Sequence, residues 1–221
     1  GTSNTIYGKD AGIALVSGAN YNVLIGEDAG KAINAGDQNT VVGYLAGDAI
    51  VGGSYNVAIG TNAGGGISSG DQNVAVGQGT MNATCTGDYN TVVGDSAGGA
   101  ITSGASNVII GQAAADALTQ GDANVAIGFN AMGDASTTDG MDGNVVIGTY
   151  AGDAFGAESV AYTTIIGYGA GRTLENEADG TVAIGFNALT ALTSGPRNVV
   201  VGYEAADGLT TGGYNTVLGY S

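Results

Sequence analysis

The pentapeptide NVAIG stands at residues 56–60 and again at 124–128, and close copies of it recur along the chain. The copies are NVLIG at 22–26, NTVVG at 39–43 and 90–94, NVIIG at 107–111 and NVVIG at 144–148. Asn and Gly at the two ends are typical of turns, and the three residues between them are mostly β-branched, which is typical of strands. A strand with one buried face alternates apolar with polar residues. These strands do not alternate, so the pattern predicts that both of their faces are covered.

The pentapeptide opens a repeat that accounts for the whole chain. Counted from its first residue, position 5 is always Gly, position 8 is nearly always Ala, and position 12 is usually Ile or Leu. Consecutive copies are usually 17 residues apart, starting at Asn4, Asn22, Asn39, Asn56, Asn73, Asn90, Asn107, Asn124, Asn144, Thr163, Thr181, Asn198 and Asn215. We therefore predict one repeat domain over residues 1–221, with irregular longer coils at 124–180.

The composition leaves one fold class. The chain has 43 Gly and one Pro, whereas collagen needs Gly at every third position and abundant Pro. Gly at this frequency would cost a helix about 1 kcal/mol each time, and a flexible linker would lack the recurring Val and Ile. We expect an all-β parallel β-solenoid (β-roll) of about 12–13 coils with a 17-residue repeat, because stacked repeats can bury what one repeat cannot.

Each coil is expected to hold a strand at positions 1–5 and a second extended piece at about positions 10–14. Position 12 should form an apolar wall, with Thr84 as its member in the coil that starts at Asn73. Cys85, the next residue, is interpreted as a small substitute at a Thr, Ser or Val position. Asn and Gly are expected at the corners, where Gly permits positive φ and the Asn side chain bonds nearby backbone. These corner residues include Asn22, Asn39, Asn56, Asn73, Gly26, Gly43, Gly60 and Gly77.

The doubly apolar strand also makes a prediction about assembly. Side chains at positions 2 and 4 share one face of a strand, and position 3 lies on the other. One face fills the coil, so the other should form an apolar stripe too long for a monomer surface. Closed symmetry would cover it with identical rods, of which three pack around one axis. A flattened monomeric roll is the alternative, and the sequence does not separate two rods from three.

Two stretches carry a family resemblance. NVAIGTNA (56–63) and NVAIGFNA (124–131) resemble the head repeats of trimeric autotransporter adhesins, although those repeats are shorter than 17 residues and match the strand and first corner only. NVLIGEDAGKAINAGDQ (22–38) looks more like Gly-rich repeats of phage tail fibres. The resemblance implies a left-handed homotrimeric β-roll outside the cell, on a cell-surface fibre or a virion tail, that binds host surface molecules. It transfers no binding residue.

The charge excludes several partners. The net charge is −16 with only four Lys and Arg, so no basic footprint for nucleic acid or an anionic membrane is present. No apolar run approaches the ~18 residues of a membrane span. Asp recurs at positions 10 and 16, which is typical of surface turns, with isolated Ca²⁺ sites between turns as the alternative. These Asp are Asp48, Asp116, Asp153 and Asp207 at position 10, and Asp37, Asp71, Asp88 and Asp122 at position 16.

Little in the sequence favours catalysis. The chain has no His, which removes the commonest acid–base group and metal ligand. Glycan cleavage would need two carboxyl groups about 5–9.5 Å apart, and the candidates are Asp71 with Asp88, or Asp37 with Asp71. We expect no enzyme and no catalytic, cofactor or metal site.

Two features are candidates for recognition. Tyr168, Phe186, Tyr203 and Tyr220 hold position 6 in four consecutive coils and should stack, either to stabilise the sheet or to receive a receptor or glycan. The longer coils carry extra residues at 134–143, 153–162 and 172–180, and loops on a rigid scaffold often carry recognition. The expected function is a non-enzymatic extracellular fibre element for attachment or receptor binding. The alternatives are a structural filament built by end-to-end stacking of coils and a glycan-cleaving tailspike.

Overall fold

The computed structural model describes residues 3–135, 140–155, 160–175 and 178–221, and the chain divides into two compact units, Gly1–Ser106 and Asn107–Ser221. The single repeat domain over residues 1–221 stays a prediction. The described residues form thirteen strands of three residues each and no helix. Unit 1 holds β1 (Thr5–Tyr7), β2 (Val23–Ile25), β3 (Thr40–Val42), β4 (Val57–Ile59), β5 (Val74–Val76) and β6 (Thr91–Val93). Unit 2 holds β7 (Val108–Ile110), β8 (Val125–Ile127), β9 (Val145–Ile147), β10 (Thr164–Ile166), β11 (Val182–Ile184), β12 (Val199–Val201) and β13 (Thr216–Leu218).

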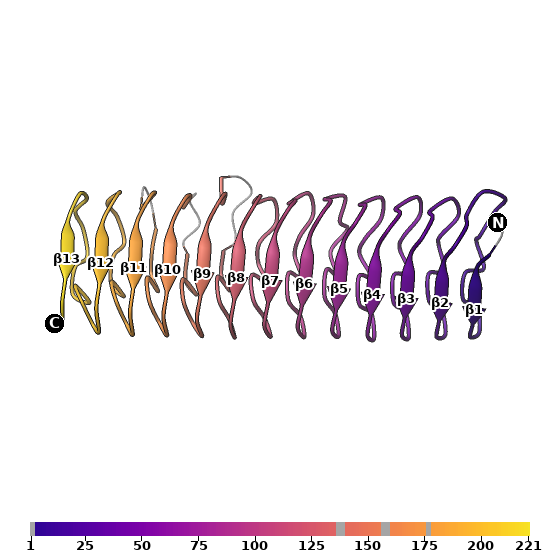
Figure 1. Cartoon of the computed structure of the whole chain (residues 1–221), viewed down its shortest axis with the longest axis horizontal. Helices are drawn as coiled ribbons and strands as arrows, with labels where there is room; N and C mark the ends of the chain where they lie inside the picture. The colour runs from indigo at the N-terminus through magenta and orange to yellow at the C-terminus, as the bar shows by residue number, and fades with distance from the viewer. Residues whose placement is uncertain (1–2, 136–139, 156–159, 176–177) are drawn as a thin grey trace. The chain divides into compact units, whose positions relative to one another are not determined.

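Within each unit the strands pair in parallel and in chain order. The register is shifted by one whole repeat, so that Ala58 of β4 lies opposite Val41 of β3 and Ala75 of β5. Figure 1 shows each strand followed by a loop that leads to the next strand. This arrangement confirms the predicted all-β parallel β-solenoid with a repeat of about 17 residues.

The strands are shorter than predicted, and the second extended piece is not a strand. Only positions 2–4 belong to strands, and tight turns take up the residues that directly follow. In the coil of β4, for example, the Ala63 N–H donates to the Gly60 carbonyl at 3.3 Å, and the Ile67 N–H donates to the Gly64 carbonyl at 3.1 Å. Beyond these turns the described residues show only isolated bridges, Ile67 with Cys85 and Ser194 with Thr211.

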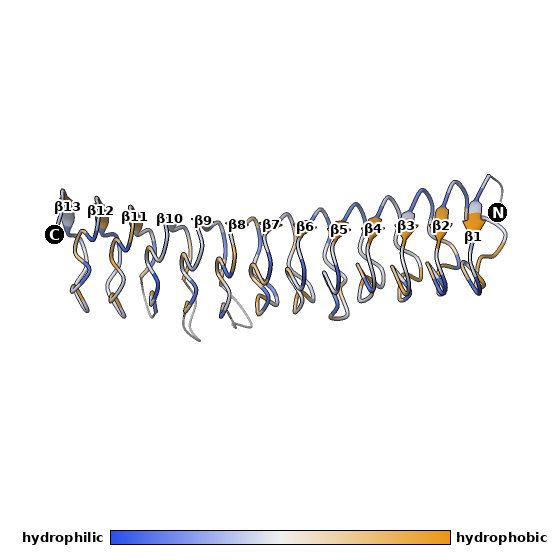
Figure 2. Cartoon of the chain, turned by 90° about the horizontal axis from the view of Figure 1, so that it is seen from below, coloured by the Kyte–Doolittle hydropathy of each residue, from blue (hydrophilic) through white to orange (hydrophobic). Residues whose placement is uncertain are grey.

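The side chain at position 3 of the repeat, which is the middle residue of the strand, fills the coil. In unit 1, Leu24, Val41, Ala58 and Ala75 are the middle residues of β2, β3, β4 and β5 and have no exposed surface. Figure 2 shows hydrophobic colour on strands such as β2 and β4. The Ala at position 8 and the apolar wall at position 12 close the core, with Ala63 and Ile67 both fully buried. The side chains at positions 2 and 4 therefore face outward. This decides which of the two apolar strand faces fills the coil.

The wall corrects one expectation about the coil that starts at Asn73. Thr84 is exposed, and the next residue, Cys85, is fully buried and pairs with Ile67 of the wall. Met81, also fully buried, stands where most other coils have Gly, and the chain reaches the wall one residue later. The interpretation of Cys85 as a small substitute at a Thr, Ser or Val position was wrong, because it holds the place of a core Ile.

Glycine at position 5 is required by the stacking of coils. Gly60 has φ +130° and Gly77 has φ +131°, a conformation that side chains rarely adopt. A Cβ on Gly60 would lie 2.9 Å from the carbonyl oxygen of Gly77, and one on Gly77 would lie 2.6 Å from that of Gly94. Glycine therefore stacks on glycine from coil to coil.

Candidate functional site

The buried Asn of each coil forms an internal ladder. The Asn56 side-chain Nδ2 donates to the Gly70 carbonyl at 2.8 Å, and its Oδ1 accepts from the Asn73 backbone N–H at 2.9 Å. The left-handed backbone lies one residue earlier, at Tyr55 with φ 62°. Asn thus acts at the corner through its side chain, and the residue before it turns the chain and points to the surface.

The ladder is interrupted in unit 2, where Thr replaces Asn twice. The Thr163 hydroxyl still donates to Asn144 Oδ1 at 2.8 Å. Thr181 is fully buried, and its hydroxyl has no hydrogen-bond partner among the residues that the structure describes. A buried hydroxyl without a partner costs stability, so the ladder is weakest at Thr181.

The side chains at positions 2 and 4 form what we call the outward strand face. Nearly all are Val, Ile or Thr and none is charged. They are half-buried by their neighbours, and Ile25, Ile59 and Ile110 remain 37%, 40% and 38% exposed. Within each unit this face is a continuous, uncharged strip of β-branched side chains.

The predicted aromatic stack is present and longer than expected. The Tyr168, Phe186, Tyr203 and Tyr220 rings are stacked, with centroids 5.5, 5.0 and 5.4 Å apart and planes within 15°. Tyr150 and Phe129 extend the row with edge-on contacts at 6.0 and 5.3 Å. Sequence reasoning missed both, because Tyr150 stands one position late in its coil and separates Phe129 from the others.

The stacking changes what this row offers to a ligand. The rings of Phe186 and Tyr203 turn their faces toward neighbouring rings, so the faces on which a sugar would stack are occupied. Their exposed parts, 39% of Phe186 and 49% of Tyr203, are edges and the tyrosine hydroxyl. The geometry suits stabilisation of the sheet, and a receptor or glycan role for the four residues stays a prediction.

A second set of aromatic residues was not anticipated. Tyr stands directly before the first Asn of several repeats, as in the YN pairs at 21–22, 55–56 and 89–90. Tyr21, Tyr55 and Tyr89 are 62%, 53% and 57% exposed. The recurring YN dipeptide was the available signal in the sequence.

The recurring Asp residues near the ends of the coils are tied to the backbone. Asp88 Oδ1 accepts from the Asp71 N–H and Asp71 Oδ1 accepts from the Ser54 N–H, both at 2.7 Å, while Asp37 Oδ1 accepts from the Asn20 N–H at 2.6 Å. Asp71 and Asp88 thus lie in adjacent coils, as predicted, and each continues the hydrogen bonding between coils. No cluster of three or more His, Cys, Asp or Glu suited to a metal ion, and no pocket, occurs in the described ranges.

Three of the Asp residues at position 10, Asp48, Asp116 and Asp153, are partly or fully buried, and Asp207 is exposed. Burial raises the pKa of Asp48, Asp116 and Asp153, and the Asp134 carboxylate nearby raises the pKa of Asp116 and Asp153 further. Arg172 partly offsets this for Asp153, with Nε 3.3 Å from its Oδ2. Asp134, one position later in the coil between them, therefore repels both Asp116 and Asp153.

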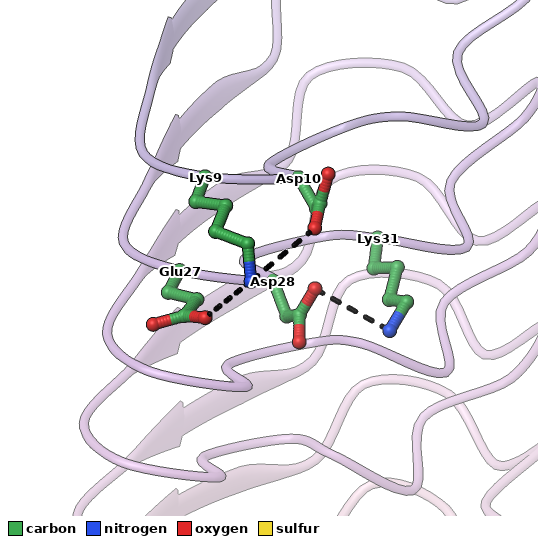
Figure 3. A network of polar contacts seen from close by, with 5 residues as sticks. All are labelled: Lys9, Asp10, Glu27, Asp28 and Lys31. Carbon is green, nitrogen blue, oxygen red and sulfur yellow. Dashed lines mark hydrogen bonds and ion pairs between the residues drawn. The ribbon is translucent and has the colours of Figure 1, made fainter.

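The basic residues are all engaged. Figure 3 shows Lys9 between Glu27, at 3.1 Å, and Asp10, at 3.8 Å, with Lys31 paired to Asp28 at 3.3 Å. The Arg172 guanidinium pairs with Asp153, and the Arg197 guanidinium lies 5.7 Å from the centre of the Tyr214 ring. The basic side chains are thus scattered singly or in one pair rather than gathered into a patch.

The insertions at 134–143, 153–162 and 172–180 lie partly outside the described residues, at 136–139, 156–159 and 176–177.

Compared with protein-family models, curated proteins and solved structures, the chain has no significant match. The described part of the chain holds no apolar helix long enough to cross a membrane.

Proposed function

We propose that this chain is a non-enzymatic element of an extracellular fibre, in which three left-handed solenoids associate laterally and present their outer surfaces for attachment. The observation that carries the proposal is the outward strand face. Soluble monomers rarely expose a continuous apolar strip. The outward strand face consists of two rows of mostly β-branched side chains along each unit. The resemblance to adhesin heads and tail fibres supports the extracellular setting.

A second copy of the same chain is the partner that fits this face best. The chain carries a net charge of −16, so two copies repel wherever their charged turns meet. The outward strand face has no charge, and its flat, β-branched surface matches another copy of itself. Three such faces around one axis would cover each other completely, as closed symmetry favours.

The state of the polar residues supports a role without catalysis. The chain has no His. The carboxylates of Asp71 and Asp88, the best candidates for glycan cleavage, accept backbone N–H groups in neighbouring coils at 2.7 Å. The single thiol, Cys85, is fully buried, and burial raises its pKa, which makes it a poor nucleophile.

Sedimentation velocity at micromolar concentration tests the association, with a mass of three chains as the expected result. The variant Ile59→Lys/Val76→Lys places two charges on the outward strand face and should sediment as a monomer with unchanged circular dichroism. Thr61→Lys, at an exposed corner outside this face, is the matched control and should remain a trimer. A monomeric wild type would overturn the proposal, and fibres of indefinite length in electron micrographs would support a stacked filament instead.

A further inference from the structure

The surface of unit 1 carries a regular array that we call the tyrosine row: Tyr21, Tyr55 and Tyr89 in every second coil, with Gln38 and Gln72 in the coils between. All five residues precede the first Asn of a repeat and have left-handed backbone, with φ from 58° to 63°. This conformation is uncommon for bulky side chains. It recurs because the chain must turn here to bring the Asn into the coil.

The backbone of the tyrosine row is held from coil to coil. The Gln38 N–H donates to the Asn20 carbonyl at 3.0 Å, and the Tyr55 N–H donates to the Asp37 carbonyl at 2.9 Å. Tyr89 repeats the bond to Asp71 at 3.1 Å. Stacked strands are about 4.8 Å apart, so the tyrosines recur every ~9.6 Å. Such a fixed array loses little conformational entropy when it binds a ligand.

The rings of the tyrosine row are open in a way that the aromatic stack of unit 2 is not. More than half of each of the three tyrosines is exposed, and within the described ranges no other aromatic ring lies against them. The Gln38 amide reaches the next coil and donates to the Tyr55 hydroxyl at 3.1 Å. The row therefore alternates apolar rings with amide groups that can donate and accept hydrogen bonds.

We propose that the tyrosine row binds an extended, neutral, β-linked polysaccharide, with one tyrosine against every second sugar. A pyranose has an apolar face for the ring and hydroxyl groups for the phenol and amide. In an extended β-linked chain, alternate sugars turn the same face to one side, so contacts recur once per disaccharide, a distance similar to two coils. The net charge of −16 disfavours anionic glycans.

A proline-rich peptide is the competing ligand class, because a polyproline helix repeats every three residues, about 9.3 Å. Domains that bind such peptides hold them in grooves lined by aromatic side chains. The tyrosine row is a single line with Gln between its rings, and no pocket is found in the described part of the chain. The observations therefore favour the polysaccharide.

Retention on insoluble cellulose, chitin, xylan and mannan tests this inference, which rests on the attachment role proposed above. Wild type should bind at least one of them, and Tyr21→Ala/Tyr55→Ala/Tyr89→Ala should bind at least tenfold more weakly. Tyr162→Ala/Tyr214→Ala, at the same repeat position in unit 2 and more exposed, is the matched control and should bind as wild type does. Circular dichroism of each variant establishes that it is folded.

A second variant distinguishes binding that depends on the spacing of the tyrosines from nonspecific binding by exposed aromatic side chains. Gln38→Tyr/Tyr55→Gln keeps the composition of the row but breaks the alternation, and it should lose most of the binding. Full binding by this variant or by the triple variant would overturn the inference. So would a wild type that binds none of the polysaccharides, or one that binds only polyproline and does so through the tyrosine row. If the wild type is a trimer but binds no polysaccharide, polysaccharide binding by the tyrosine row is refuted and lateral association is not. If it is a monomer that binds polysaccharide, only lateral association is refuted.

Discussion

At the scale of single residues, the backbone leaves little choice at position 5. Gly60 and Gly77, for example, combine positive φ with a carbonyl group from the next coil at the place where a Cβ would be. Gly52 is different, because its φ is not positive and no atom lies within 4 Å of a Cβ built there. The chain thus contains both a Gly that the fold needs and one that it does not.

Gly77→Ala should therefore destabilise unit 1 by on the order of 3 kcal/mol, the sum of backbone strain and a collision with the Gly94 carbonyl. Gly52→Ala should be neutral or stabilising by about 0.5 kcal/mol, because it restricts the unfolded chain without strain. Guanidinium denaturation followed by circular dichroism measures both. Equal stability of the two variants would contradict the stacking of glycine on glycine.

The pKa shift of Asp116 makes a prediction about pH. Burial raises its pKa above the ordinary 3.8, so the folded state binds this proton more tightly than the unfolded state does. Stability should then fall as pH rises from about 3.8 through the raised pKa, with the full cost above it. Asp116→Asn should raise the melting temperature at pH 7 and leave it unchanged at pH 3.

The control for this pH effect is Asp207→Asn, which changes the same repeat position where the side chain is exposed. Its melting temperature should differ little from that of the wild type at either pH. A gain from Asp116→Asn that is equally large at pH 3 would show that the effect is not electrostatic.

At the scale of the structural element, the Asn ladder connects the coils inside the sheet. Asn73 accepts the Asn90 N–H at 2.9 Å and donates to the Gly87 carbonyl at 2.9 Å, all in the buried interior. Two buried backbone groups thus depend on one side chain. Thr181 shows the opposite case, in which a hydroxyl is buried without a partner among the described residues.

Asn73→Ala should cost about 3 kcal/mol, because two buried backbone groups lose their partners. Thr181→Asn should gain about 1 kcal/mol by restoring the ladder between Thr163 and Asn198. Denaturation midpoints of the two variants, at unchanged m-values, provide the measurement. A loss of stability in Thr181→Asn would mean that this coil has no room for the amide.

The repeat in the sequence was sufficient to predict the solenoid, its period and its apolar columns. It could not decide which strand face fills the coil, because Ala58 and Ile59 are both apolar and only burial separates them. It also misplaced the wall at Thr84, because nothing in the repeat pattern marks that this coil reaches the wall one residue later, at the buried Cys85. The tyrosine row was not predicted because its YN pairs recur only in every second coil, so the array is visible only across coils.

At the scale of the whole molecule, the excess of negative charge bears on assembly. The four basic side chains already have acidic or aromatic partners within the chain, so neighbouring chains meet as bodies of like charge. An uncharged contact surface must then overcome a repulsion that acts through the solvent. Added salt screens this repulsion without weakening apolar contacts.

The dissociation constant of the proposed trimer should therefore fall, by about threefold or more, when the salt concentration rises from low values to about 0.15 M. Sedimentation equilibrium at several salt concentrations gives this value. An interface built from ion pairs would respond in the opposite direction, and weaker association at higher salt would argue against the outward strand face as the contact.

The one-repeat register of the strands has a consequence for how such a chain changes over generations. Each coil meets its neighbours through the same glycine, asparagine and apolar columns, so a duplicated repeat meets a surface that already fits it. Gain or loss of one repeat changes the length of a unit by the spacing of one coil, about 4.8 Å. A single-residue insertion in a strand would instead turn the core side chains outward. Length is therefore a quantity that selection can adjust in whole steps, while the surface residues of each coil diverge independently.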